Sequence, residues 1–130
     1  MSTTTCPFCP PPADRLVASN ELAVAIRDGY PVSPGHTLVI PKRHVASLAE
    51  ITEDEVEAMW SLLAGARAKL DAELKPDGYN VGVNDGRAAG QTVMHLHVHL
   101  IPRFDGDRPD PRGGVRWVIP DKADYWSERD

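Results

Sequence analysis

The sequence has few cysteines, no long apolar run and no excess of positive charge. Both of its cysteines lie in one short motif, Cys6-Pro7-Phe8-Cys9, so a cytoplasmic protein with reduced thiols is expected. No apolar run approaches the roughly 20 residues of a membrane span, so no membrane partner is expected. The net charge of −5 argues against binding nucleic acid through a broad basic face. The stretch Met1–Thr5 has neither a basic region nor an apolar core, so it does not predict a signal peptide.

The length and composition are those of an ordinary globular domain. A chain of 130 residues, 42% apolar and 25% charged, is long enough to bury a core and predicts one domain over residues 1–130. Within it, residues 1–12 form a segment rich in cysteine and proline, and residues 104–130 are expected to form an irregular tail.

The order of hydrophobic patterns predicts an α+β fold. Strands, then one strong helix, then further strands imply an antiparallel sheet of about five strands with one long helix. The predicted strands are a hairpin with a turn at Ser19-Asn20, two further β-rich runs, and a strand through three histidines: Arg15–Ala18, Glu21–Arg27, His36–Pro41, Tyr79–Asn84 and His95–Ile101.

The predicted helix runs from Thr52 to Leu74. Thr52 with Glu55 forms a capping box, and acidic residues crowd the first turn, which suits the helix dipole. Apolar side chains recur at helical spacing and are expected to pack on the sheet: Val56, Met59, Trp60, Leu62, Leu63, Ala66 and Leu70.

The most informative stretch places histidines at every second position. His95, His97 and His99 alternate with apolar residues, which is the period of a β-strand, so three imidazoles should share one face. The opposite face is expected to be apolar: Met94, Leu96, Val98 and Leu100. Three interpretations compete: a structural accident, a three-His zinc site that activates water, and a catalytic face.

The approach to this strand favours the catalytic interpretation. Gly86 and Gly90 flank a short loop whose backbone amides are expected to form a nest for phosphate. Asn84, Gln91 and Thr92 add polar side chains. A loop suited to phosphate therefore leads into a strand rich in nucleophiles.

This pattern resembles the histidine triad (HIT) family of nucleotide hydrolases and transferases. The match lies in His-φ-His-φ-His-φ-φ at His95–Ile101, preceded by Asn84-x-Gly86-x-x-x-Gly90-Gln91-Thr92-Val93, and it extends over about Cys6 to Arg103. The resemblance implies a HIT-like fold, a two-fold homodimer and a purine nucleotide as substrate. Implied substrates are dinucleoside polyphosphates, such as diadenosine tetraphosphate, and nucleoside phosphoramidates.

The resemblance also assigns roles to residues. It implies that His97 is the nucleophile that attacks the α-phosphorus and forms a nucleotidyl-histidine, with His99 and Thr92 assisting and no metal needed for the chemistry. The residues that it implies for nucleotide binding are Asp28, Asn84, Gly90, Gln91, Thr92, Val93 and His99. Asp28 would hold the ribose, although a turn before Gly29 explains this aspartate equally well.

Cys6-x-x-Cys9 allows three interpretations: half of a zinc site, a redox pair or a disulfide. The prolines that follow disfavour the helix that a redox motif requires. The resemblance implies a structural zinc completed by His44 and His95, although the family usually continues into a short helix after the second cysteine.

Three further expectations concern the remaining segments. Lys42 and Arg43 either steer a polyphosphate or only solubilise the surface, and His36 is given no role. Gly113–Pro120 is expected to form a late strand, with Trp117 or Trp126 stacking on a base, capping the site or anchoring the tail. A nucleotide-binding regulator with little turnover remains an alternative to an enzyme.

Overall fold

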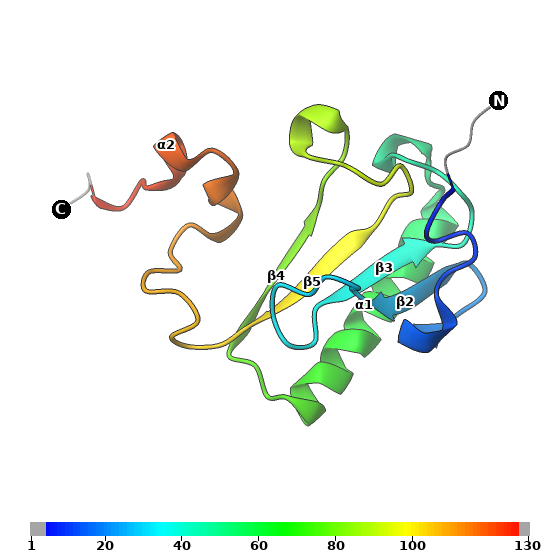
Figure 1. The fold of residues 1–130 in the computed structure, drawn as a ribbon, viewed down its shortest axis with the longest axis horizontal. Helices are drawn as coiled ribbons and strands as arrows, with labels where there is room; N and C mark the ends of the chain where they lie inside the picture. The colour runs from blue at the N-terminus through cyan, green and yellow to red at the C-terminus, as the bar shows by residue number, and fades with distance from the viewer. Residues whose placement is uncertain (1–4, 128–130) are drawn as a thin grey trace.

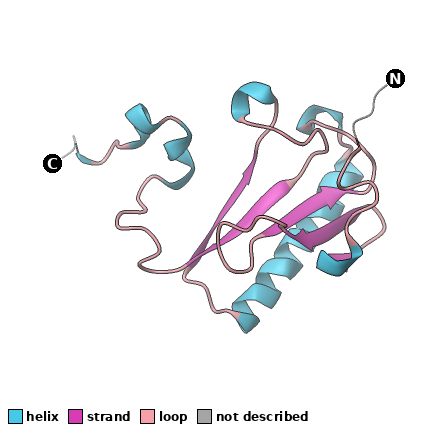
Figure 2. Ribbon diagram, in the orientation of Figure 1, coloured by secondary structure: helices cyan, strands magenta, loops and turns pink. Residues whose placement is uncertain are grey.

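The computed structural model describes residues 5–127, and it shows a five-stranded antiparallel sheet with one long helix across one face (Figures 1 and 2). The strands follow the order β1-β2-β3-β5-β4 across the sheet. The predicted α+β fold is therefore confirmed. The strand bounds are β1 Leu16–Ser19, β2 Ala23–Arg27, β3 Thr37–Pro41, β4 Gly78–Val83 and β5 Val98–Arg103.

The long helix α1, Glu53–Glu73, forms as its ends predict. The Thr52 side chain accepts from the Glu55 amide, and the Glu55 carboxylate accepts from the Thr52 amide, so the capping box is complete. Neither α1 nor any other helix within residues 5–127 is long and apolar enough to cross a membrane.

The apolar stripe of α1 is narrower than predicted. Five of its members are buried against the sheet: Met59, Leu62, Leu63, Ala66 and Leu70. The prediction was wrong for Val56 and Trp60, which are 48% and 65% exposed. They lie on one flank of the helix, where no element within the described residues covers them.

The strand through the histidines begins later than predicted. β5 starts at Val98, so only His99 of the three histidines lies in the ladder. Val98 pairs with Val39, so continuing the ladder by two residues would set Leu96 opposite Pro41. Proline has no amide hydrogen to donate. The Leu96 amide instead donates to the Val45 carbonyl at 2.7 Å, and the chain leaves the sheet.

The apolar side of this stretch is largely as expected. Leu96 and Leu100 are buried in the core beneath α1, and Val98 packs against them. Met94 is 42% exposed and precedes β5, so the prediction that it shares the apolar face of the strand was wrong. A second, smaller apolar cluster covers the opposite face of β2 and β3, where Val93 packs at its edge; its buried members are Phe8, Val24, Ile26, Leu38 and Ile40.

Between Phe104 and Ser127 the chain forms two short helices and no strand. The predicted late strand is replaced by the 3₁₀ helix η4, Gly114–Val118, and by α2, Pro120–Ala123. Gly113 and Gly114 both have positive φ, which turns the chain out of an extended path, and Pro120 suits the first turn of a helix. Figure 1 shows this segment, in orange, standing beside β4 on the far side of the sheet from the N-terminus.

Candidate active site

His97 lies just before β5 with one ring nitrogen fixed. Its Nδ1 is 2.8 Å from the carbonyl oxygen of His95. Because a carbonyl only accepts, Nδ1 carries a hydrogen, and in the neutral ring the lone pair is on Nε2. The ring of Phe8 packs edge-on against His97, with centroids 5.6 Å apart, and the ring of His99 lies 5.1 Å away on the other side. In this tautomer the nucleophilic nitrogen of half-buried His97 is Nε2.

His99 is oriented by a chain of hydrogen bonds that begins at the loop before β3. The Val32 amide donates to His36 Nδ1 at 3.1 Å, so the hydrogen of His36 is on Nε2. That nitrogen lies 2.9 Å from His99 Nδ1 and 3.3 Å from the Asp28 carboxylate. His99 Nδ1 is then the acceptor, and His99 Nε2 is left as a donor beside His97.

Burial keeps this pair uncharged at neutral pH. Burial, followed by the neighbouring His97 and His36 rings, lowers the pKa of His99 to about 4. Burial also lowers the pKa of His36, with the Asp28 carboxylate acting in the opposite direction. Two neutral imidazoles can share one hydrogen bond, whereas two imidazolium ions at this distance would repel.

The sequence alone gave no role to His36, and the structure corrects this. His36 is only 3% exposed, and it connects Asp28 to His99. The contact depends on the register that sets Leu38 opposite His99, which places the residue two before Leu38 next to the histidine. In the sequence, the only indication of this role is that His36 stands at the start of a buried strand, on the same face as Leu38.

Four donor atoms meet at the N-terminal side of the site. His95 Nδ1 lies 3.3 Å from the Sγ atoms of both Cys6 and Cys9 and 3.2 Å from His44 Nδ1. Cys9 Sγ lies 3.4 Å from His44 Nδ1, and all four atoms are within 4.8 Å of one another. A zinc tetrahedron, with bonds of about 2.0–2.3 Å, has edges of roughly 3.3–3.8 Å. The four residues therefore fit a tetrahedral metal.

The protonation of these groups also suits a cation. His95 is fully buried, and its Nε2 donates to the Pro41 carbonyl at 2.8 Å, so the Nδ1 lone pair faces the cysteines. Burial and then the adjacent Cys6 raise the pKa of the Cys9 thiol, because two neighbouring thiolates repel. A divalent cation removes that repulsion.

This geometry separates His95 from the other two histidines. Both of its ring nitrogens are engaged, one toward the cysteines and one with Pro41. Within residues 5–127 the groups able to hold a metal are the Cys6, Cys9, His44, His95 set and Asp28 with His36 and His99. The second set is explained by its hydrogen bonds. No group unites His95, His97 and His99, so the arrangement does not favour a three-His zinc hydrolase.

The glycine loop before the histidines adopts the backbone that its glycines predict. Gly86 and Gly90 have φ of 95° and 94°, and η3, Arg87–Ala89, spans them. Gln91 is buried and holds the loop: its carbonyl accepts from the Gly86 amide, and its two N–H groups donate to Ala46 and Val93 carbonyls. The amides of Ala89, Gly90 and Gln91 also donate inside the loop. These groups shape the loop and are not free donors.

The other predicted nucleotide-binding residues surround the histidines at different depths. Asn84 and Thr92 are exposed on either side of the loop, and Val93 packs on the apolar cluster with Phe8. Asp28 follows β2; one of its oxygens accepts from the Tyr30 amide at 2.8 Å and the other faces His36. Both the turn role and a site role are thus compatible with its position.

The Arg43 guanidinium is occupied by an ion pair. It donates two hydrogen bonds, of 2.7 and 3.1 Å, to the buried Glu55 carboxylate and another to the Glu50 carbonyl. This ion pair holds the pKa of Glu55 at about 2, mainly through the hydrogen bonds from Arg43. Arg43 therefore ties the segment before His44 to the start of α1.

Several proteins of known sequence are similar to this chain. A HIT-like protein of Mycoplasma genitalium is 37% identical over 108 residues, which cover 80% of this chain and 77% of that protein. The AP-4-A phosphorylase of Mycobacterium tuberculosis is 38% identical, over 71% of this chain and 48% of its own length. The bis(5'-adenosyl)-triphosphatase of Dictyostelium discoideum is 37% identical, over 71% of this chain and 63% of its own.

Solved structures of HIT family proteins are also similar to this chain. A HIT family member from Bacillus subtilis superposes with a TM-score of 0.73 at 33% identity, over 79% of this chain and 76% of that one. A zinc-bound histidine triad family protein from Mycobacterium smegmatis gives 0.71 at 35% identity, over 88% and 90%. The sequence model of the HIT domain matches residues 12–106. Together with the histidine geometry, these matches show that the chain belongs to the HIT domain family.

Proposed function

We propose that this protein is a nucleotide hydrolase that cuts at the α-phosphate of a dinucleoside polyphosphate or a nucleoside phosphoramidate. One observation carries the proposal: His97 has its Nδ1 hydrogen held by a carbonyl, so the free lone pair is on Nε2, next to the His99 donor. The names of two relatives, AP-4-A phosphorylase and bis(5'-adenosyl)-triphosphatase, support substrates of this class.

In the first step His97 Nε2 attacks the α-phosphorus, and a nitrogen–phosphorus bond forms. In a dinucleoside polyphosphate the bond from phosphorus to the bridging oxygen breaks, and the nucleoside polyphosphate departs with the electron pair. In a phosphoramidate the phosphorus–nitrogen bond breaks, and the nitrogen departs with the electron pair as ammonia or an amine after it takes a proton from solvent. The Nδ1 hydrogen stays on the ring, where the His95 carbonyl stabilises the positive charge that develops. His99 donates from Nε2 to a phosphate oxygen and stabilises charge in the transition state.

In the second step water attacks the same phosphorus on the side opposite His97. The nitrogen–phosphorus bond breaks, its electron pair returns to Nε2, and the proton from water passes to solvent. For diadenosine tetraphosphate the sum is one water consumed, one AMP and one ATP released. Two displacements at phosphorus restore its configuration.

The nucleotide-binding roles extend from these two histidines. Asp28 is proposed to accept hydrogen bonds from the ribose, since the carboxylate lies beside His36 at the end of β2. Thr92 and Asn84 are proposed to donate to the transferring phosphate from the exposed side. The remaining members of the binding set act through the loop and its packing: Gly90, Gln91 and Val93.

Zinc is proposed to have a structural role. Cys6, Cys9, His44 and His95 supply four ligands, which is a closed set with no position for water. When bound, the metal joins the N-terminal motif to the residue two before His97. The chemistry itself uses no metal in this proposal, and reduced thiols suit a cytosolic protein.

A homodimer is also proposed. The exposed Val56 and Trp60 flank of α1 is an apolar patch, and β4 is an edge strand with unpaired backbone groups. A second copy of the same chain, related by a two-fold axis, would cover both features.

A turnover screen tests the proposal against the regulatory alternative. Adenosine phosphoramidate, diadenosine tri- and tetraphosphates and their guanosine counterparts are incubated with zinc-loaded protein, and released mononucleotide is measured. Turnover above about 0.1 s⁻¹ on any of them supports an enzyme, since typical kcat values start near 1 s⁻¹. Tight nucleotide binding without turnover would make the protein a regulator.

A further inference from the structure

Among the four proposed zinc ligands, His44 is the one held least by contacts of its own. His95 is buried and donates from Nε2 to the Pro41 carbonyl at 2.8 Å, so its ring is fixed independently of a metal. Cys6 and Cys9 share a tight turn, in which the Cys9 amide donates to the Cys6 carbonyl at 3.2 Å. His44 is exposed, and within residues 5–127 its ring lies within hydrogen-bonding distance of only Cys9 and His95. The position of this ring therefore depends on the backbone that carries it.

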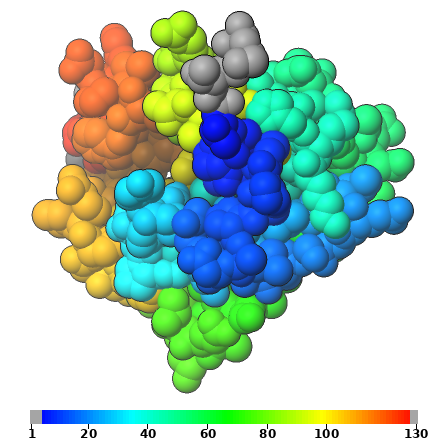
Figure 3. Space-filling model, turned by 45° about the vertical axis from the view of Figure 1, so that its right-hand side comes forward, coloured from blue at the N-terminus to red at the C-terminus, as the bar shows by residue number. Residues whose placement is uncertain are grey.

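That backbone forms a bend between two points that are held by hydrogen bonds. Before His44, the Lys42 amide donates to the Leu22 carbonyl at 2.8 Å, and after it the Val45 carbonyl accepts a backbone hydrogen bond of 2.7 Å. Arg43 lies on the bend between these points, next to His44 in the sequence. In Figure 3 the turquoise segment that follows β3 lies beside the dark-blue N-terminal motif. The bend at Arg43 therefore determines how the imidazole of His44 meets the cysteines.

The Arg43 guanidinium attaches this bend to the start of α1. It donates from Nε and Nη2 to the two oxygens of the Glu55 carboxylate, at 3.1 and 2.7 Å, and from Nη2 to the Glu50 carbonyl at 2.8 Å. A planar guanidinium that meets a carboxylate at two points fixes orientation as well as distance. Glu55 is buried and also completes the capping box with Thr52, so it is a rigid anchor.

We propose that Arg43 is a positioning residue for zinc: by holding the bend against α1, it places the His44 imidazole beside the other three ligands. Ligands that are in place before the metal arrives bind it more tightly, since less order has to be imposed on binding. The inference rests on the proposed zinc site and extends it to a residue outside the four ligands. It does not depend on the nucleotide chemistry.

The test is a zinc titration of the full, reduced chain in competition with a chromophoric chelator. Arg43→Ala should weaken zinc affinity about 10-fold, the lower end of the range of roughly 10- to 100-fold for residues that orient metal ligands. Arg43→Lys keeps the charge but not the planar fork, so it should recover only part of the affinity. Glu55→Gln breaks the same fork from the other side and keeps an oxygen for the Thr52 amide, so it should weaken zinc binding to a similar extent.

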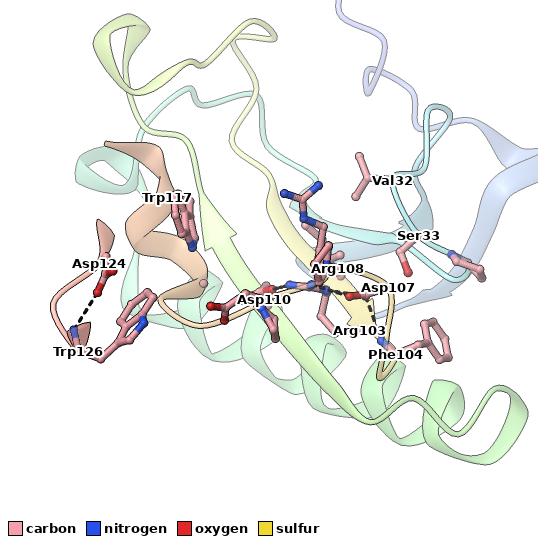
Figure 4. A pocket seen from close by; sticks show the side chains of 16 residues that line it. Val32, Ser33, Arg103, Phe104, Asp107, Arg108, Asp110, Trp117, Asp124 and Trp126 are labelled. Carbon is pink, nitrogen blue, oxygen red and sulfur yellow. Dashed lines mark hydrogen bonds and ion pairs between the residues drawn. The ribbon is translucent and has the colours of Figure 1, made fainter. Parts of the chain in front are cut away.

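Two matched variants separate positioning from a loss of charge or of stability. Lys42→Ala removes the neighbouring exposed positive charge and should leave zinc affinity unchanged. Arg103→Ala removes a second guanidinium fork, in which Arg103 donates to both oxygens of Asp107 at 2.7 and 2.8 Å, at the opposite end of β5 from the histidines (Figure 4). This variant should lower the melting temperatures of the zinc-free and zinc-loaded protein alike, with no change in zinc affinity.

A double-mutant cycle shows whether Arg43 acts through His44. In a His44→Ala background three ligands remain, and Arg43→Ala should then have no further effect on zinc affinity. A residue that only stabilised the fold would weaken zinc binding by the same factor in both backgrounds.

The result that would overturn the inference alone is a wild-type chain that binds zinc and an Arg43→Ala variant that binds it equally well. An equal effect of Lys42→Ala, or an equal effect of Arg43→Ala with and without His44, would also overturn it. If the wild-type chain binds no zinc, the proposed zinc site is wrong and this inference falls with it. The titration contains no nucleotide, so its result is independent of whether the protein is a hydrolase.

Discussion

At His97 one hydrogen bond decides which ring nitrogen is available for chemistry. The His95 carbonyl takes the Nδ1 hydrogen, and the neighbouring His99 receives its own hydrogen bond from His36. Three of the residues involved were predicted from their spacing in the sequence. His36 was not, because its role arises from pairing between β3 and β5, which lie about 60 residues apart along the chain.

The pH dependence of stability follows from the buried histidines. The pKa of His99 is lowered to about 4, so between pH 6.5 and 4 the unfolded chain binds a proton that the folded chain does not. The free energy of unfolding is therefore at its full value above pH 6.5 and falls as the pH drops toward 4. Urea unfolding from pH 7.5 to 4.5 should show a smaller decline in His99→Gln than in the wild type. Equal declines would contradict the assignment.

Asp28 provides a test of nucleotide recognition. Asp28→Ala should weaken ribonucleotide binding by about 1–3 kcal/mol, because hydrogen bonds from the ribose to a charged group are lost. A 2′,3′-dideoxy analogue should show little of that loss in calorimetric titration. Asp28→Asn is the matched control, since its side chain still accepts from the Tyr30 amide and preserves the turn. Equal losses for both ligands would leave Asp28 with the turn role alone.

Among the helices and strands, the sequence predicted the position of an element correctly where residues of the same segment stabilise it. The capping box and acidic first turn placed α1 correctly, and the turn at Ser19-Asn20 placed the first hairpin. The predictions from the sequence were wrong where contacts with another segment of the chain decide the structure. Alternation alone extended β5 back to His95, but the lack of an N–H at Pro41 ends the ladder earlier. The β-branched residues of Gly113–Pro120 form η4 and α2 instead of a strand, because the positive φ of Gly113 and Gly114 turns the chain out of an extended path.

The four residues proposed to hold zinc connect the Cys6–Cys9 motif to His44 and His95, in addition to the packing of Phe8 in the apolar cluster. Chelation, or Cys9→Ser, should lower the melting temperature by more than about 10 °C, as expected for losing a structural zinc worth several kcal/mol. Metal analysis of the reduced protein should find about one zinc per chain, bound through four ligands. Lys69→Ala, an exposed change on the flank of α1 opposite Trp60, controls for a general loss of stability.

Two results would oppose the structural role. Purified protein that lacks zinc and melts at the same temperature with and without chelator would show that zinc has no structural role. Chelation that abolishes turnover while the melting temperature stays unchanged would make the metal catalytic.

At the scale of the whole molecule, the exposed flank of α1 predicts self-association. Sedimentation at micromolar concentration should give twice the chain mass of 14.2 kDa. Trp60→Glu should shift the equilibrium to monomer because a charge replaces an exposed indole on the proposed interface. Lys69→Glu, on the opposite flank nine residues further along α1, is the control. A wild-type protein that stays monomeric at all concentrations would contradict the prediction.

A covalent nucleotidyl-histidine at His97 is the central step of the proposed reaction, and it can be observed directly. The protein is mixed with a slowly cleaved adenosine phosphoramidate or diadenosine polyphosphate, quenched in base within one turnover, and digested for mass spectrometry. We expect an adenylyl group on His97 of the Asn84–Arg103 region, its absence in His97→Asn, and retention of configuration at an isotopically chiral α-phosphorus. No adduct, together with inversion at phosphorus, would show that water attacks the substrate directly and would contradict the account.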